Sequence, residues 1–319
     1  MEKKIVFGFS TFQIFRNFLV LENFYFFHFW IFRKIFFLEK EEFIFFLFFQ
    51  KLFFESMFFI FFYFLVDLVL LFFVPLLWTL EYIRKKRTSI DTSIKSSYPP
   101  SILLLHGSGF DESEWLVGRT FLSLYNNPKY GQVFSLNYDT CSTKGIEDFA
   151  TNEIRNKCLE IQKVTGQSQI ILIGHSMGGL VASYYAEHLS KKDNIDIEHI
   201  ITIATPWQGT PLLETIWYYT NYSWKTEKRY PQMSCSSFFR KILLDKILLV
   251  QANKKEKKIQ YYNLYSENDF FVNKKHGLIS EQIPHKEINS CGHYLIIVHP
   301  QTWITITNWL DQIYSSSFS

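Results

Sequence analysis

The sequence predicts an α/β fold in which a mostly parallel sheet is covered by helices on both faces. From residue 101 onward, short aliphatic runs alternate with stretches of helical periodicity. The aliphatic runs are apolar almost throughout, as in strands that are buried on both faces. Because right-handed crossovers place the carboxyl ends of all such strands at one edge of the sheet, we expect the functional site at that edge.

The individual elements follow from local patterns. Apolar residues recur at close to helical spacing over residues 146–166, and Gly166 is placed to end that helix as its C-cap. The other predicted helices are residues 111–125, which open with acidic residues, and residues 176–190, which begin at a glycine-rich turn. Strands are predicted at residues 101–105, 132–138, 169–174, 197–205 and 259–265.

The N-terminal region differs in composition from the rest of the 319 residues. Of the 35 phenylalanines, 26 lie in the first 80 residues, where neither strand nor helix periodicity organises them. We therefore separate residues 1–55 from the fold. We expect translation to begin at Met57, which would leave residues 1–56 untranslated; membrane-associated helices are the alternative.

Residues 56–80 are predicted to form a transmembrane anchor. The 25 residues carry one charge, Asp67, and about 20 apolar residues suffice to cross a bilayer. A central Asp costs about 2.5–3.5 kcal/mol, which the many Phe and Leu residues outweigh. The basic cluster at residues 84–87 indicates a single-pass protein whose C-terminal domain faces the cytoplasm. Residues 81–100 form a basic flank and a linker.

Charge and cysteine content exclude several classes of function. The net charge of +3 belongs entirely to residues 81–319, which is too mild to indicate a nucleic-acid partner. The cysteines show no zinc spacing, so we expect reduced or buried thiols, and the sequence predicts no metal and no cofactor. These cysteines are Cys141, Cys158, Cys235 and Cys291.

A candidate nucleophile lies between a predicted strand and a predicted helix. Ser176 stands in "GHSMG", directly after the aliphatic run "IILI". A serine on such a strained turn needs neighbours without side chains, and Gly174 and Gly178 supply that room. The alternative is a glycine-rich turn that serves packing alone.

A serine nucleophile needs a base and a carboxylate that orients the base. His293 follows Gly292 in a loop of the last quarter of the chain, which suits a base. The carboxylate should follow a strand between the serine and the histidine, and Asp269 is predicted there with Glu267 as the alternative. Each of these residues could instead be a solvated surface group.

Acyl transfer also needs two N–H donors for the oxyanion that develops. The backbone N–H of Met177 is one. The second is expected in the loop "HGSG", from Ser108 or else from Gly107. A phosphate-binding loop is the alternative, but the lysine of a P-loop is missing.

Together these motifs resemble the α/β-hydrolase superfamily, and within it bacterial lipases and hydrolases similar to GPI inositol-deacylase. "LLLHGSGF", "IILIGHSMGG", "ITIATPWQGTPL", "YSENDFFV" and "CGHYLI" occur in the order of that superfamily over roughly residues 100–315. The resemblance implies Ser176 as nucleophile, Asp269 as acid, His293 as base, and oxyanion donors from Ser108 and Met177. Residues 1–99 have no counterpart, and the first strands usual before the "HG" loop are missing.

The function expected from these features is the hydrolysis of carboxylic esters, in particular lipid or other acyl esters, by a membrane-anchored enzyme. An aromatic and amphipathic insertion at about residues 210–256 suits a cap over an acyl chain, although a helix that packs on the sheet would explain its pattern equally well. An acyltransferase or thioesterase with the same triad, and a non-catalytic membrane-anchored binding protein, are the alternatives.

Overall fold

The computed structural model describes residues 62–67, 69, 100–124, 130–140, 142–212, 214–215, 229–252 and 259–316. The predicted segment 1–55, most of the predicted span 56–80 and residues 81–99 of the linker lie outside these residues. No helix within the described ranges is both long enough and apolar enough to cross a bilayer.

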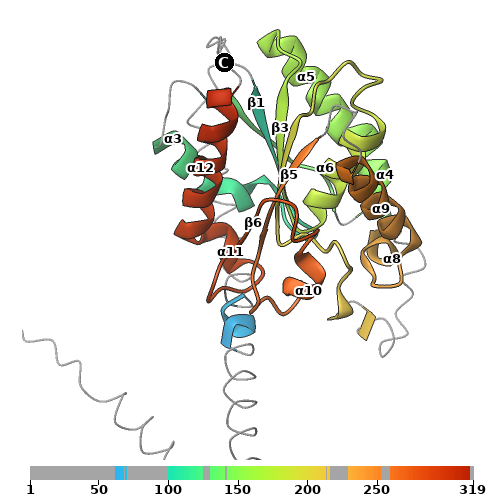
Figure 1. Cartoon of the computed structure of the whole chain (residues 1–319), viewed down its shortest axis with the longest axis vertical. Coiled ribbons are helices and arrows are strands. Elements are labelled where there is room, and N and C mark those ends of the chain that lie inside the picture. Colours follow the sequence, from blue (N-terminus) through green and yellow to red (C-terminus); the bar gives the residue numbers. More distant parts are fainter. Residues whose placement is uncertain are drawn as a thin grey trace, which may run out of the picture. The chain divides into compact units, whose positions relative to one another are not determined.

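The core of the domain is a six-stranded sheet in which every neighbouring pair is parallel, in the order β2-β1-β3-β4-β5-β6 (Figure 1). This confirms the α/β fold and its parallel sheet. β6 was not predicted, because its three residues are polar and it pairs only at the edge of the sheet. The strands are β1 (Ser101–Leu105), β2 (Val133–Leu136), β3 (Ile170–His175), β4 (His199–Ile203), β5 (Gln260–Tyr265) and β6 (His285–Glu287).

The helical segments alternate with the strands along the chain. The predicted helix over 146–166 is confirmed, and a π-helical turn, η2, interrupts it. It ends where Gly166 takes a φ of 74°, the left-handed conformation that favours glycine at a C-cap. The segments are η1 (Glu112–Trp115), α3 (Leu116–Leu124), α4 (Ile146–Phe149), η2 (Ala150–Ile154), α5 (Arg155–Thr165), α6 (Met177–His188), α8 (Arg229–Met233), α9 (Phe238–Ala252), α10 (Lys274–Gly277), α11 (Leu295–Val298) and α12 (Pro300–Ser316).

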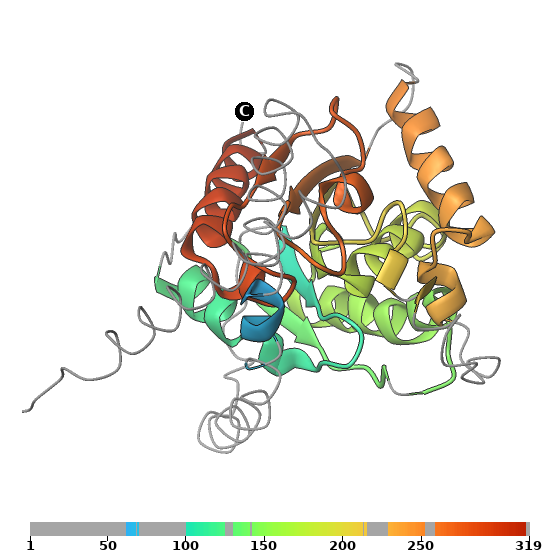
Figure 2. The ribbon, with the colours of Figure 1, turned by 90° about the horizontal axis from the view of Figure 1, so that it is seen from below.

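Helices cover both faces of the sheet, so the strands have two buried faces (Figures 1 and 2). Along β1, Leu103 and Leu105 pack into one core with α4, α5, α6 and α9. The alternate residues Ile102 and Leu104 pack into a second core with Trp303 of α12. Alternation between two cores explains why residues 102–105 of β1 are apolar at every position.

The loops that follow β1, β3, β5 and β6 all leave the same edge of the sheet, because the strands are parallel. These loops contain the "HGSG" motif, Ser176, Asp269 and His293 respectively. The fold therefore brings together four sequence motifs that lie up to about 190 residues apart.

Three of the four cysteines lie in the described residues, and all three are free thiols. Burial raises the pKa of the Cys158 and Cys291 thiols to about 12, so neither forms a reactive thiolate near neutral pH. Cys141 lies outside the described residues.

Candidate active site

Ser176 occupies a strained turn between the end of β3 and the first residue of α6. Its φ of 52° and ψ of −124° are rarely adopted by a residue with a side chain. The turn is held because the N–H of Ser176 donates to the carbonyl of Ile203 at 2.8 Å, and the N–H of Gly179 donates to the Ser176 carbonyl at 3.1 Å. Such a turn presents the hydroxyl at the edge of the sheet.

The glycines around Ser176 allow backbones to approach closely. A Cβ on Gly174 would lie 2.5 Å from the backbone N of Gly179, and one on Gly178 would lie 2.3 Å from the carbonyl oxygen of Leu105. A Cβ on Gly107 would lie 3.1 Å from Cβ of Ser176. The sharp turn and the nearby loop after β1 therefore both depend on missing side chains.

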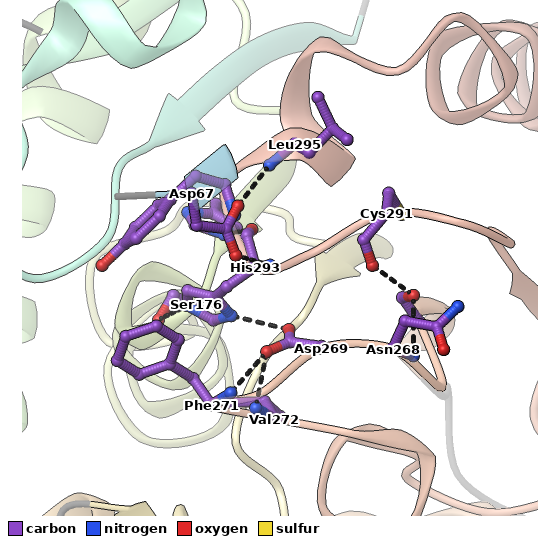
Figure 3. A network of polar contacts seen from close by, with 12 residues as sticks. Asp67, Ser176, Asn268, Asp269, Phe271, Val272, Cys291, His293 and Leu295 are labelled. Atoms are coloured by element: carbon purple, nitrogen blue, oxygen red, sulfur yellow. Dashed lines mark hydrogen bonds and ion pairs between the residues drawn. The ribbon is translucent and has the colours of Figure 1, made fainter. Parts of the chain in front are cut away.

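His293 joins Ser176 and Asp269 in one line of hydrogen bonds (Figure 3). Nδ1 of His293 lies 2.7 Å from Oδ2 of Asp269. A carboxylate only accepts, so Nδ1 carries the proton and Nε2 is left as an acceptor. Nε2 lies 3.0 Å from Oγ of Ser176, so the hydroxyl donates to the base that would remove its proton.

The structure also distinguishes the two candidate carboxylates. Oδ1 of Asp269 accepts the N–H groups of Phe271 and Val272, each at 2.8 Å, which leaves Oδ2 directed at His293. Asp269 is buried, whereas the alternative, Glu267, is exposed. Asp269 therefore has both the contact and the fixed orientation that the triad geometry requires.

The electrostatic environment of His293 favours its protonated form. Burial lowers the pKa of this imidazole, but the carboxylates of Asp269, Asp67 and Glu114 outweigh that effect and raise the pKa above its usual 6.5. A stabilised imidazolium is what a base needs after it has accepted the serine proton.

The loop after β1 holds two of its N–H groups in structural hydrogen bonds. The N–H of Gly107 donates to Oε2 of Glu114 at 3.0 Å, and that of Gly109 donates to Oγ1 of Thr140 at 2.9 Å. Among the described residues, the N–H groups of Ser108 and Met177 have no hydrogen-bond partner. The geometry thus leaves Ser108, rather than Gly107, free to donate to an oxyanion.

Comparison with known proteins agrees with this arrangement. A model of the PGAP1-like alpha/beta domain matches residues 146–310, about half of the chain. The chain belongs to this family. The matched range contains Ser176, Asp269 and His293, whereas the "HGSG" loop lies before it.

Two similar proteins extend the comparison. GPI inositol-deacylase of Candida albicans (strain SC5314 / ATCC MYA-2876) is 29% identical over 120 residues, which cover 33% of this chain and 30% of that protein. The mature form of the Bacillus licheniformis lipase BlEst2 has the same fold, with a TM-score of 0.53 and 18% identity over 67% of this chain and 93% of its own. The chain is thus an ester-hydrolase homologue, and the predicted resemblance is confirmed.

Within the insertion at 210–256, α9 is a helix that packs on the sheet of this PGAP1-like domain. α9 places Leu243, Leu244 and Ile247 in the core beside α6. It therefore matches the alternative interpretation, a helix that packs on the sheet. The aromatic residues predicted to line a cap, at positions 217–224, lie outside the described residues.

Sequence reasoning missed two charged residues at the site. Glu114 was taken only as part of an acidic helix start, but its carboxylate is buried and holds the loop after β1. Asp67 was taken as a lone charge in a bilayer, but it is buried against the His293 loop and accepts backbone hydrogen bonds there (Figure 3). In the sequence Asp67 is marked only as a lone carboxylate in an apolar run, and nothing distinguishes Glu114 from the acidic residues before it.

Proposed function

We propose that this PGAP1-like domain is a serine hydrolase that cleaves carboxylic esters through an acyl-enzyme on Ser176. The observation that carries the proposal is the continuous hydrogen-bond line from Ser176 through His293 to Asp269. Family membership and the names of the similar proteins, a deacylase and a lipase, support the same class of reaction.

The proposed reaction has two halves. His293 takes the Ser176 proton through Nε2 while Oγ attacks the ester carbonyl carbon, and the N–H groups of Ser108 and Met177 stabilise the resulting oxyanion. The C–O bond to the alcohol then breaks, and His293 returns its proton to that alcohol. A water molecule, deprotonated by His293, attacks the acyl-enzyme and releases the carboxylic acid and free Ser176.

We propose lipid or other acyl esters as the substrate class. The predicted membrane anchor supports this choice, because it would hold the site near such esters. The Candida protein is named GPI inositol-deacylase, so an acyl group carried on inositol is the first substrate to test. The chain spans less than a third of that protein, and the substrate of this chain is therefore our proposal.

Membrane attachment through the N-terminal apolar region outside residues 62–67, with the catalytic domain on the cytoplasmic side, is part of the same proposal, because Asp67 is buried against the His293 loop and not in a bilayer. The basic residues 84–87 support this orientation. Protease treatment of sealed membranes containing a C-terminally tagged protein tests it, since a tag that stays protected would contradict the orientation.

The nucleophile is tested by labelling with a fluorophosphonate probe and by hydrolysis of p-nitrophenyl esters of increasing chain length. Wild-type protein should take one label and hydrolyse the esters, whereas Ser176→Ala should do neither. Ser315→Ala is the matched control, because Ser315 lies on α12 and donates only to the Asp311 carbonyl. A wild-type protein that takes no label would contradict the proposed nucleophile.

A further inference from the structure

Asp67 lies next to the proposed base although it precedes it by 226 residues. Its Oδ2 accepts the N–H of His293 at 2.8 Å, and its Oδ1 accepts the N–H groups of Tyr294 at 3.0 Å and Leu295 at 3.2 Å (Figure 3). Only 1% of Asp67 is exposed. One carboxylate therefore satisfies three successive backbone donors of the His293 loop, of which the N–H of His293 is buried.

The same short helical segment, residues 62–67, also touches the loop of the acid. The ring centroid of Phe64 lies 5.1 Å from that of Phe270 and 6.5 Å from that of Phe271. The centroid of the Phe271 ring lies 5.2 Å from that of the His293 imidazole, and the backbone N–H of Phe271 donates to Asp269. The segment thus contacts both loops that bring base and acid together.

The His293 loop is shaped to receive this carboxylate. A Cβ on Gly292 would lie 2.2 Å from Oδ2 of Asp67 and 2.7 Å from its Cγ. The residue before His293 can therefore be only glycine while Asp67 stays in place. The need for glycine at position 292 is an observation separate from the hydrogen bonds. It indicates that the loop is shaped around the Asp67 carboxylate at this position.

We propose that Asp67 is a positioning residue for His293, and that Phe64 and Asp67 together hold the loops of the acid and the base in their relative positions. The inference rests on the proposed function. It places Asp67, which was predicted to lie in the membrane anchor, beside the catalytic base instead of in the bilayer.

The charge of Asp67 affects a measurable quantity, the pKa of the His293 imidazole. Three carboxylates raise the pKa of His293: Asp269 from the loop after β5, Asp67, and Glu114 from η1. The aromatic rings of His175, Phe271 and Tyr294 face the same imidazole. Loss of the Asp67 charge should therefore lower the pKa of His293, whereas a residue that only supports the fold would leave that pKa unchanged.

The test compares Asp67→Asn with Leu65→Ala in the full chain, purified in detergent. Leu65 belongs to the same segment but is 41% exposed, so it is a matched control. Asp67→Asn should lower kcat by about 100-fold, which a misplacement of the base by about 1 Å can cost, with little change in KM. The acidic limb of its pH profile should move to lower pH, and Leu65→Ala should resemble the wild type.

Titration of the His293 ring by NMR provides a second measurement that does not depend on turnover. Its midpoint should be lower in Asp67→Asn. If the NMR midpoint, kcat and the pH profile of Asp67→Asn equal those of the wild type, Asp67 has no role in positioning His293. Labelling of Ser176 in the same samples would show that the proposed function still holds.

If Asp67→Asn does not fold, Gly292→Ala tests the same contact by displacing the carboxylate. Wild-type kinetics in that variant would equally overturn the proposal.

Discussion

The side chains of Glu114 and His175 are both buried, and Oε1 of Glu114 lies 2.6 Å from Nδ1 of His175. The second carboxylate oxygen of Glu114 accepts the N–H of Gly107. At the other end, Nε2 of His175 donates to the carbonyl oxygen of His293 at 3.1 Å. A buried polar chain therefore connects the loop of Ser108, one of the two proposed oxyanion donors, with the loop of the proposed base.

Replacement of Glu114 by Ala should disturb both ends of this chain. We expect kcat for ester hydrolysis to fall by about 100-fold, because the loop after β1 loses the acceptor that fixes it. The free energy of unfolding should fall by about 1–3 kcal/mol, since Gly107 and His175 lose a buried partner. Glu160→Gln, at an exposed ion pair on α5, should change neither quantity. Steady-state kinetics and denaturant unfolding measure the two effects.

The raised pKa of His293 predicts opposite effects of pH on activity and stability. The base must be neutral to accept a proton, so kcat/KM should rise with pH through a midpoint above 6.5. Protonation of His293 favours the native state, so its contribution to stability is complete below pH 6.5 and is lost as the pH rises through the raised pKa. Activity and thermal unfolding of wild type and His293→Ala, measured from pH 5 to 9, would show both trends.

Asp269→Asn should lower the midpoint of the pH dependence of kcat/KM. It should also reduce kcat by about 10⁴-fold, as the equivalent change does in the serine-protease triad. The amide cannot hold the ring in the tautomer that leaves Nε2 free to accept the Ser176 proton. Asp245→Asn on the exposed side of α9 is the control and should keep the wild-type profile. A variant that retained more than a tenth of wild-type kcat would exclude Asp269 as the acid.

Gly178→Ala should prevent the close contact between α6 and the end of β1. The added Cβ would lie 2.3 Å from the Leu105 carbonyl oxygen, and backbone cannot move aside easily. We expect a loss of about 1–3 kcal/mol in unfolding free energy together with a loss of labelling at Ser176. Gly277→Ala, whose nearest neighbour is a Val272 side-chain atom at 3.2 Å, should have a smaller effect.

The packing of α9 predicts different responses at two leucines of the same helix. Leu243→Ala should cost about 2–5 kcal/mol of unfolding free energy, because Leu243 is buried in the core. Leu249 is 71% exposed, and Leu249→Ala should change stability by less than about 0.5 kcal/mol. Equal effects in thermal or denaturant unfolding would contradict the assignment of α9 to the layer beside α6.

The sequence was most informative where one local pattern determined one element. The runs of Ile and Leu in β1, β3 and β4 read as buried strands because both faces of the sheet are covered. The position of Ser176 followed from its glycines and the strand before it. The parallel order of the strands then placed the loops of Asp269 and His293 at the same edge, where the structure brings their side chains together.

The sequence did not predict hydrogen bonds between a buried carboxylate and backbone groups that lie far away along the chain. A carboxylate in an apolar run has no visible partner in the sequence, so Asp67 was counted as a cost of bilayer insertion. Its partners are three backbone N–H groups, which every residue except proline carries and which therefore leave no mark in the sequence. The role of Glu114 was not predicted for the same reason, because its carboxylate accepts a hydrogen bond from the backbone N–H of Gly107.

The separation of 226 residues between Asp67 and His293 also has a consequence for the time at which the site forms. At a synthesis rate of about 5–20 residues per second, Asp67 leaves the peptidyl-transferase centre roughly 11–45 s before the loop that it holds. The contact that positions the base can therefore form only after residue 295 has been made. A ribosome whose chain has not yet reached this residue would hold no active hydrolase, however long residues 62–67 have been available.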